Sequence, residues 1–191
     1  MIANDLSASA QLKTDELISR KATMADIPAL LDLINGYAAG GIMLPRTEME
    51  LSENIRDFTV LYSGFRLIGC GALHFYTPTS AEVRSLAVAA DFKVHGIGKK
   101  IVEALTAEAI ENNLHAIFAF TYVPDFFRKL GFREVERGTL PLKVWKDCLR
   151  CPKFQCCDEI AMLKVLSSRG PAKNSTDHEL GLVELPRLRQ N

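Results

Sequence analysis

The residue types that bind a pyrophosphate occur in the segment 88–100, VAADFKVHGIGKK, which joins an extended stretch to the most regular helical pattern in the chain. The first turn of a helix leaves about four backbone N–H groups without intrahelical partners and carries roughly half a positive charge. Gly96 and Gly98 let an anion approach that backbone. Three lysines add positive charge around the same point: Lys93, Lys99 and Lys100. The segment therefore predicts a phosphate site at the start of a helix.

Two other phosphate-binding motifs fit this segment less well. A Walker loop requires Ser or Thr after its lysine, and here Lys100 follows Lys99. A dinucleotide-binding motif requires a third glycine where this chain has Ile101. A glycine-rich turn without a ligand remains open from this segment alone.

The hydrophobic pattern around the segment predicts a mixed sheet with helices. Apolar residues recur at helical spacing over 96–113, on the face that contains Ile97 and Ile101. Thr23 and Thr47 are capping residues that mark two earlier helix starts. The remaining predicted elements are strands at 17–20, 59–62, 66–75, 82–89, 115–121 and 160–166, and a short helix at 126–130. Their order predicts the α+β class, with helices on both faces of a mixed sheet.

Composition argues against several classes of protein. Lys plus Arg and Asp plus Glu both number 23, which argues against a nucleic-acid partner. No apolar run approaches the roughly 18–20 residues of a membrane span, and segment 1–14 lacks the pattern of a signal peptide. The five cysteines are clustered and odd in number, which indicates a reducing cytoplasm rather than a disulfide framework.

A chain of 191 residues fits one domain with loose ends. We expect a flexible N-terminal end at 1–15 and a folded domain at 16–166. The domain includes a cysteine-rich loop at 148–158, and a flexible tail follows at 167–191.

Three motifs resemble those of the GNAT superfamily of N-acetyltransferases: Leu86-Ala-Val88, Lys93-x-x-Gly96-x-Gly98 and Phe126-Phe-Arg-Lys-Leu-Gly-Phe132. The resemblance covers roughly 17–166. It implies the GNAT fold, a central mixed and mostly antiparallel twisted sheet, with acetyl-CoA as co-substrate. It also implies that the backbone after Lys93 holds the pyrophosphate, while the strand end 86–88 pairs with the pantetheine arm. The residues so assigned are Leu86, Ala87, Val88, Val94, His95, Gly96, Ile97, Gly98 and Lys99.

The chain departs from the family pattern at two positions. Lys93 stands where Arg or Gln is usual, which is a mild change because the backbone provides most of the binding. Phe127 stands where many members have a tyrosine general acid, so that role is vacant.

Four further stretches are similar to the short bacterial N-acetylglutamate synthases: Gly41-Ile-Met-Leu-Pro-Arg46, Phe58-Thr-Val60, Ile68-Gly-Cys-Gly-Ala-Leu73 and Asp125-Phe-Phe-Arg128. The resemblance implies transfer of acetyl to the α-amine of glutamate, the first step of arginine synthesis. It also places Arg46 and Arg84 beside the acceptor. A guanidinium satisfies a carboxylate with two parallel hydrogen bonds, although either arginine can instead be solvated or structurally paired. The longer synthases carry an Arg-x-Ser pair that corresponds to 161–163, where this chain is apolar, so glutamine could compete with glutamate.

Glu82 is the predicted general base. An α-amino group in water has a pKa of about 7.7–8.0 and must lose a proton before it attacks a thioester. Some GNAT members carry a glutamate base at this place on the central strand. A period of two puts Glu82, Arg84 and Leu86 on one face. A structural pairing of Glu82 with Arg84 or a lysine remains the alternative, and backbone N–H groups near Val88 would meet the developing oxyanion.

The cysteine cluster comprises Cys148, Cys151, Cys156 and Cys157. Thiolates at such spacing can bind Zn²⁺, and a redox pair or simply reduced side chains are the alternatives. We assign no metal.

The prediction is an acetyl-CoA-dependent amino-acid N-acetyltransferase that acts on glutamate, or glutamine, through a ternary complex in the cytoplasm. Its partners are small molecules, with no nucleic acid and no membrane, and a homodimer is left open. Two alternatives remain: an acetyltransferase for protein N-termini or small amines, and a non-catalytic acetyl-CoA sensor.

Overall fold

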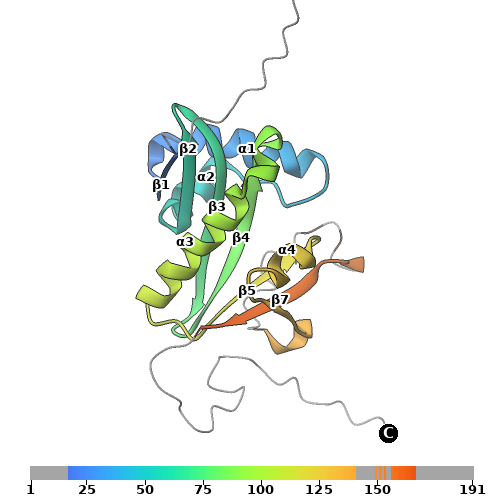
Figure 1. Ribbon diagram of the computed structural model, residues 1–191. Coiled ribbons are helices and arrows are strands. Elements are labelled where there is room, and N and C mark those ends of the chain that lie inside the picture. The colour runs from blue at the N-terminus through green and yellow to red at the C-terminus, as the bar shows by residue number, and fades with distance from the viewer. Residues whose placement is uncertain (1–16, 141–148, 150, 152, 154–155, 167–191) are drawn as a thin grey trace, which may run out of the picture.

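A seven-stranded sheet in the order β1-β2-β3-β4-β5-β7-β6 forms the centre of the computed structural model, which describes residues 17–140, 149, 151, 153 and 156–166 (Figure 1). The strands are β1 Leu17–Lys21, β2 Phe58–Ser63, β3 Arg66–Thr77, β4 Ser80–Val88, β5 Ala116–Thr121, β6 Arg133–Glu134 and β7 Ile160–Val165. Only β4 and β5 run parallel; every other neighbouring pair in this sheet is antiparallel. The predicted α+β class is confirmed.

Helices cover both faces of the sheet, as predicted. The helices are α1 Ile27–Ala39, α2 Glu48–Asn54, α3 Ile97–Glu111 and α4 Pro124–Arg128, with 3-10 turns η2 Met24–Asp26, η3 Ile55–Asp57, η4 Ala90–His95 and η5 Arg137–Thr139. The helices α3 and α4 share one hydrophobic core, while α1 and α2 share another on the opposite face. The predicted stripe on α3 is confirmed, since these side chains are at most 1% exposed: Ile97, Ile101, Leu105 and Ala109.

Local capping rules account for the two N-terminal helices. The Glu50 N–H donates to the Thr47 hydroxyl at 3.2 Å, and the Thr47 N–H donates to the Glu50 carboxylate at 2.9 Å, which forms the predicted capping box of α2. Before α1, the buried Asp26 carboxylate accepts hydrogen bonds from the Arg20 guanidinium and from the Thr23 N–H, all within 2.8 Å. The hydrogen bonds from Arg20 hold the pKa of Asp26 well below its ordinary value, even though burial opposes this shift.

Two glycines on β3 allow α3 to lie directly against the sheet. A Cβ atom at Gly69 would lie 2.8 Å from the Ile101 Cδ1 atom and 2.9 Å from the Ile97 Cγ2 atom. A Cβ atom at Gly71 would likewise lie 2.8 Å from Ile101. Because real Cβ contacts are longer, these glycines fix how closely the first half of α3 approaches the sheet, and so they fix where its N-terminus lies.

Some expectations lie outside the described residues or differ in detail. The ends expected to be flexible, 1–15 and 167–191, are outside the described part, as is much of the cysteine-rich loop. The two-residue strand β6 was not predicted, because so short a segment has no detectable period. Within the described residues, no helix is long and apolar enough to cross a membrane.

Candidate active site

The strands β4 and β5 separate at their carboxyl ends. Their parallel pairing covers only three positions, from Ser80–Ala116 to Glu82–Phe118, although both strands continue further. Figure 1 shows β5 turning away from β4 toward the side of α4. The edge of β4 beyond Glu82 therefore faces a gap rather than a strand, and the carboxyl ends of parallel strands are a frequent place for ligands.

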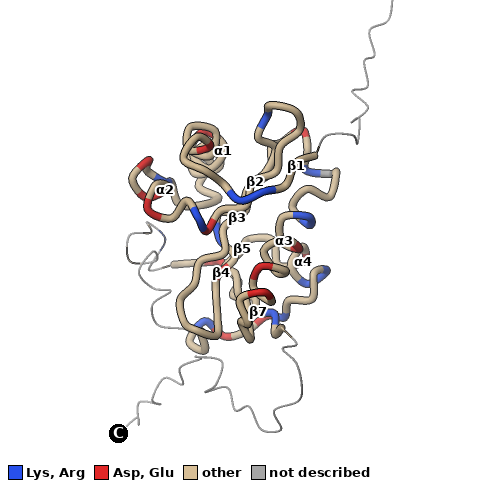
Figure 2. Tube along the Cα trace, turned by 90° about the vertical axis from the view of Figure 1, so that its left-hand side faces the viewer, with Lys and Arg blue, Asp and Glu red and all other residues tan. Residues whose placement is uncertain are grey.

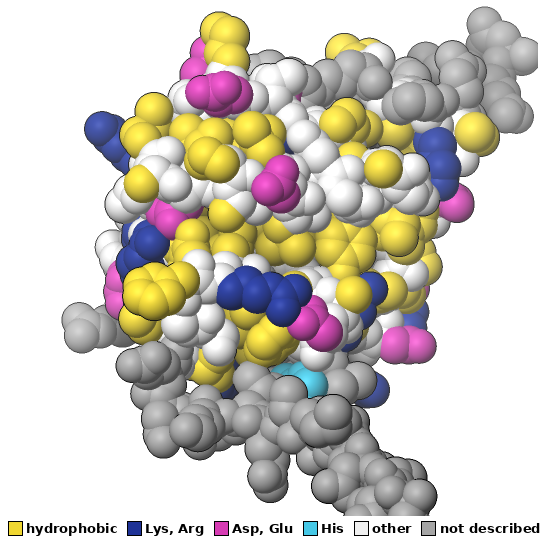
Figure 3. Space-filling view, turned by 90° about the horizontal axis from the view of Figure 1, so that it is seen from above, with side chains coloured by type: hydrophobic (Ala, Val, Ile, Leu, Met, Phe, Trp, Pro, Cys, Tyr) yellow, Lys and Arg dark blue, Asp and Glu magenta, His cyan; other side chains and the backbone are white. Residues whose placement is uncertain are grey.

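A cavity of about 390 Å³ occupies this region, a volume within the usual range for small-molecule sites. Its lining includes the carboxyl half of β4, the end of β5 and the loop between α1 and α2. It also includes Arg137, Cys151, Lys153, Cys157 and Glu159. Seen from above, the molecule presents a band of hydrophobic side chains with charged side chains along its edges (Figure 3). All three residues predicted to contact or activate the acceptor line the cavity: Arg46, Glu82 and Arg84.

A β-bulge at Ser85 corrects one part of the prediction. Three residues of β3, from Cys70 to Ala72, lie opposite four of β4, from Ala87 to Arg84, and Ser85 has a left-handed φ of 52°. The bulge reverses the alternation, because the extra residue shifts every later side chain to the other face. Leu86 packs in the α3 core, whereas Arg84 contacts α2 on the opposite face, so Leu86 does not share a face with Glu82 and Arg84.

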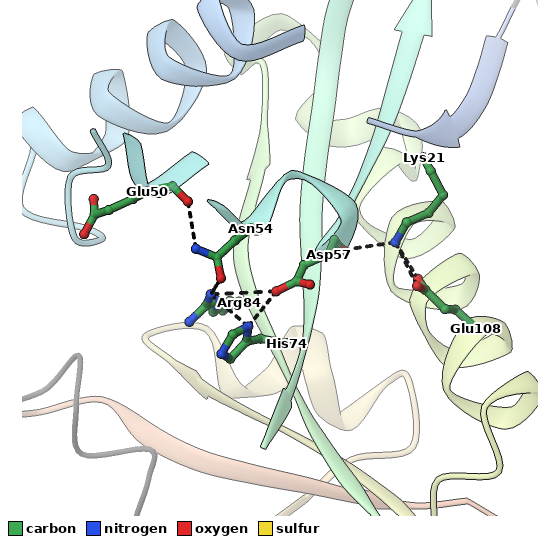
Figure 4. Close-up of polar contacts among 7 residues, drawn as sticks. All are labelled: Lys21, Glu50, Asn54, Asp57, His74, Arg84 and Glu108. Carbon is green, nitrogen blue, oxygen red and sulfur yellow. Dashed lines mark hydrogen bonds and ion pairs between the residues drawn. The ribbon is translucent and has the colours of Figure 1, made fainter. Parts of the chain in front are cut away.

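Arg84 belongs to a polar network between β4 and α2 (Figure 4). Its Nη2 atom lies 3.0 Å from the His74 Nδ1 atom, 3.4 Å from the Asn54 side-chain oxygen and 3.9 Å from the Asp57 carboxylate. His74 Nδ1 in turn lies 2.5 Å from Asp57. This network holds the Arg84 guanidinium at the cavity wall. Arg84 is therefore structurally paired, one of the alternatives that the sequence left open, and it also lines the cavity.

Arg46 lies on the loop between α1 and α2, and its backbone is held from α1. The Asn35 side chain accepts from the Arg46 N–H at 2.8 Å and donates to the Arg46 carbonyl at 2.9 Å. This pair of hydrogen bonds fixes the loop at the mouth of the cavity. The position of Arg46 is therefore set by its backbone, while its half-buried side chain lines the cavity.

The predicted phosphate cradle has the geometry expected of an anion site. Gly96 caps α3 with a left-handed φ of 73°, a conformation that favours glycine, and open space surrounds the point where its Cβ would lie. Within the described residues, no side chain caps this helix. The first amides of a fifteen-residue helix therefore point out beside the end of β4, and this arrangement fits a pyrophosphate.

The charged residues of the cradle differ in their surroundings. Lys93 is exposed, with its Nζ atom 4.9 Å from the Tyr37 ring centroid, and the Lys99 Nζ atom lies 3.7 Å from Glu103 one turn along α3. Lys100 and His95 are exposed. Figure 2 shows basic and acidic positions interspersed over the described elements.

The strand end at 86–88 is held by a contact from α1. The Tyr37 hydroxyl donates to the Val88 carbonyl at 2.5 Å. On the β3 side, Val88 and Ala87 pair with Gly69 and Cys70. The strand end is therefore rigid, and its other edge faces the gap, which is the arrangement that an extended ligand such as a pantetheine arm requires.

The family model described as the acetyltransferase (GNAT) family matches residues 30–132, which is more than half of the chain. The chain belongs to this family. GNAT enzymes use acetyl-CoA as the acetyl donor, and both the cradle at 93–99 and the open edge of β4 fit that co-substrate.

Two relatives and one solved structure agree with this assignment. A Chlorobaculum tepidum protein described as an uncharacterized N-acetyltransferase is 44% identical over 147 residues, which cover 77% of this chain and 95% of that protein. A Mycobacterium tuberculosis amino-acid acetyltransferase is 33% identical over 70% of this chain and 78% of its own length. A crystal structure of a Mycobacterium tuberculosis protein with CoA has a TM-score of 0.68 and 30% identity, covering 78% of this chain and 99% of that chain.

The remaining predictions concern the final strand and the cysteines. Ala161, Met162 and Leu163 of this GNAT protein are buried, at most 2% exposed, and lie in the hydrophobic cores rather than at the cavity. Cys148 lies outside the described residues, and the described cysteines are free thiols. In the part of the chain that the structure describes, no group of three or more His, Cys, Asp or Glu side chains is placed to hold a metal ion.

Several cavity or cradle residues were not found from the sequence. Tyr37 and Asn35 lie on α1, 51 and 11 residues along the chain from the groups that they hold, and no local motif marks them. Four others line the far wall of the cavity: Tyr122, Arg137, Lys153 and Glu159. Their arrangement depends on the path of the chain between β5 and β7, which no spacing in the sequence reveals.

Replacing Gly96 with Asp should raise the dissociation constant for acetyl-CoA about a hundredfold or more, equivalent to about 3 kcal/mol, because it puts a carboxylate where phosphate oxygens belong. Isothermal titration calorimetry measures this change. Gly96→Asn is the matched control, since Asn has the same size and tolerates a left-handed φ but carries no charge. Equal affinities of the wild type and the Asp variant would contradict the cradle assignment.

Proposed function

We propose that the protein transfers the acetyl group of acetyl-CoA to the α-amine of glutamate, or of glutamine, in a ternary complex. One observation carries the proposal: a single cavity at the separated ends of β4 and β5 holds Glu82 together with Arg46 and Arg84. The name of the Mycobacterium tuberculosis relative and the resemblance to the short N-acetylglutamate synthases support an amino-acid acceptor. The reaction would be the first step of arginine biosynthesis, carried out in the cytoplasm.

The residues of the cavity suit each part of this chemistry. Acetyl-CoA supplies an acetyl group activated as a thioester. Arg46 and Arg84 hold the α-carboxylate of the acceptor away from the reacting carbon, so that the amine faces the gap beside β4. Glu82, directly or through one water, takes the proton that the ammonium group must lose before its nitrogen forms the new C–N bond. Backbone N–H groups near Val88 stabilise the oxyanion that forms as the nitrogen attacks the carbonyl carbon. The oxyanion then collapses as the C–S bond breaks, and CoA leaves as a thiolate that takes up the second proton of the nitrogen, directly or through water.

The alternatives make different demands on the cavity. A protein N-terminus or a polyamine brings no α-carboxylate, so Arg46 and Arg84 would have no role toward such an acceptor. A non-catalytic sensor is consistent with Phe127, which lines the cavity in place of a tyrosine and is 4% exposed. An amino-acid acceptor brings an α-carboxylate and so gives both arginines a binding role.

A screen of the twenty amino acids tests the proposal directly. Release of CoA from acetyl-CoA, followed with a thiol reagent at pH 8, should be fastest with glutamate or glutamine. The acetylated product is then identified by mass spectrometry. Turnover only with peptides or polyamines would favour the first alternative, and no turnover with any amine would favour the sensor.

Arg46→Ala should lower kcat/KM for the acceptor by an amount equivalent to about 2–5 kcal/mol, because it leaves a carboxylate unpaired in a partly buried site. The KM for acetyl-CoA should not change. Arg56→Ala is the control, since Arg56 is exposed on η3 and does not line the cavity. An unchanged kcat/KM for glutamate in the Arg46 variant would remove the chemical support for an amino-acid acceptor.

Glu82→Gln should lower kcat at pH 7 by about a hundredfold or more, with little change in acetyl-CoA affinity, because general-base catalysis contributes about 10²–10⁴-fold. Raising the pH to 9 should restore part of the rate, since more of the α-amine is then neutral in solution. Steady-state kinetics between pH 6.5 and 9.5 measure both effects. Full activity at pH 7 would show that Glu82 is structural.

A further inference from the structure

The far wall of the cavity carries charged residues that the proposed reaction does not use. Arg137, Lys153 and Glu159 line the same cavity as Arg46 and Arg84, but they come from the segment between β5 and β7. This segment is separate from β4, which carries Arg84, and from the loop that carries Arg46.

Arg137 is held in place at this wall. It begins the turn η5, its guanidinium donates to the backbone carbonyl of Glu159, and the Cζ atom lies 5.8 Å from the Phe120 ring centroid. A guanidinium has five N–H donors in a rigid planar fork, and this hydrogen bond engages one nitrogen. An oriented guanidinium at a cavity wall is the group best suited to bind a carboxylate through two parallel hydrogen bonds.

Lys153 is held at the cavity by an aromatic residue. Its Nζ atom donates to the Tyr122 hydroxyl at 3.3 Å and lies 4.8 Å from the centroid of that ring, and the exposed Asp158 carboxylate lies 3.6 Å away. Burial raises the pKa of the Tyr122 phenol. Lys153 is therefore a positioned charge, and like Arg137 it lies close enough to Glu159 for its charge to lower the pKa of that carboxyl group.

The balance of charge identifies what the cavity suits. Four cationic side chains line the cavity: Arg46, Arg84, Arg137 and Lys153. Two carboxylates line it as well, those of Glu82 and Glu159. Among the lining residues the cations exceed the carboxylates by two, while Asp57 lies 3.9 Å from Arg84 and Asp158 lies 3.6 Å from Lys153 outside the lining. Cations at both sides of the cavity suit an acceptor with two carboxylates and a neutral amine better than one with a single carboxylate. Burial raises the pKa of the Glu159 carboxyl group, and the charges of Arg137 and Lys153 oppose this shift.

We propose that Arg137 and Lys153 bind the side-chain carboxylate of the acceptor, so that the enzyme selects glutamate and its dicarboxylic homologues over glutamine. The inference rests on the proposed function, because it assumes that Arg46 and Arg84 hold the α-carboxylate. One pair of cations then binds the α-carboxylate of the substrate and the other pair binds its side-chain carboxylate. The amine is adjacent to the α-carboxylate, between these two contacts.

The test compares glutamate with glutamine, which have nearly the same size and differ in one charge. The wild-type protein should have the higher kcat/KM for glutamate. Arg137→Gln and Lys153→Gln should each lower kcat/KM for glutamate about tenfold or more and change that for glutamine by no more than about twofold. Arg133→Gln is the matched control, because Arg133 is exposed on β6 and does not line the cavity, and it should leave the ratio unchanged.

Three results would overturn the inference while leaving the proposed function intact: a wild type that does not prefer glutamate, variants that lower both acceptors equally, or variants that raise the KM for acetyl-CoA alone. Should Arg137→Gln not fold, Lys153→Gln decides the question, since the Lys153 side chain is 44% exposed and belongs to none of the hydrophobic cores. Failure of the wild type to acetylate any amino acid would instead contradict the proposed function itself.

Discussion

Pairing between β4 and β5 is limited to three positions, and the two strands part beyond Glu82 and Phe118. A parallel strand buried in a sheet normally has its backbone groups bonded on both edges, so the parting leaves one edge of β4 facing a cavity. The cavity lies in this gap, and the helix cradle stands at the end of the same strand. Donor and acceptor can therefore meet along one length of β4, without a nucleophile from the protein.

The gap keeps its shape because each of its sides is fixed by contacts away from it. On one face, Gly69 and Gly71 set how closely α3 approaches β3, and thereby where the cradle begins. On the other, α1 holds both the Val88 carbonyl, through Tyr37, and the loop of Arg46, through Asn35. Preorganisation of this kind places charged groups before a substrate arrives, which reduces the cost of ordering them on binding.

Much of the fold could be predicted because its determinants are local. The stripe on α3 and the capping box at Thr47 each follow from residues close in sequence, and the structure confirms them. The glycines of the cradle are also a local signal, and Gly96 has the left-handed φ that favours glycine. The face of Leu86 could not be predicted, because the bulge at Ser85 adds a residue to β4 at a position that no glycine marks. The presence of Arg137 and Lys153 at the cavity also could not be predicted, because it depends on long-range packing of the segment before β7.

The most direct test of this account is a crystal structure of the protein with CoA and N-acetylglutamate bound together. We expect the pyrophosphate against the backbone N–H groups of 96–99, the pantetheine arm along the open edge of β4, and the amide of the product between Glu82 and the sulfur. The carboxylates of the product should contact the cations of the cavity. CoA bound away from the gap between β4 and β5, or a product on the α3 face of the sheet, would contradict the account.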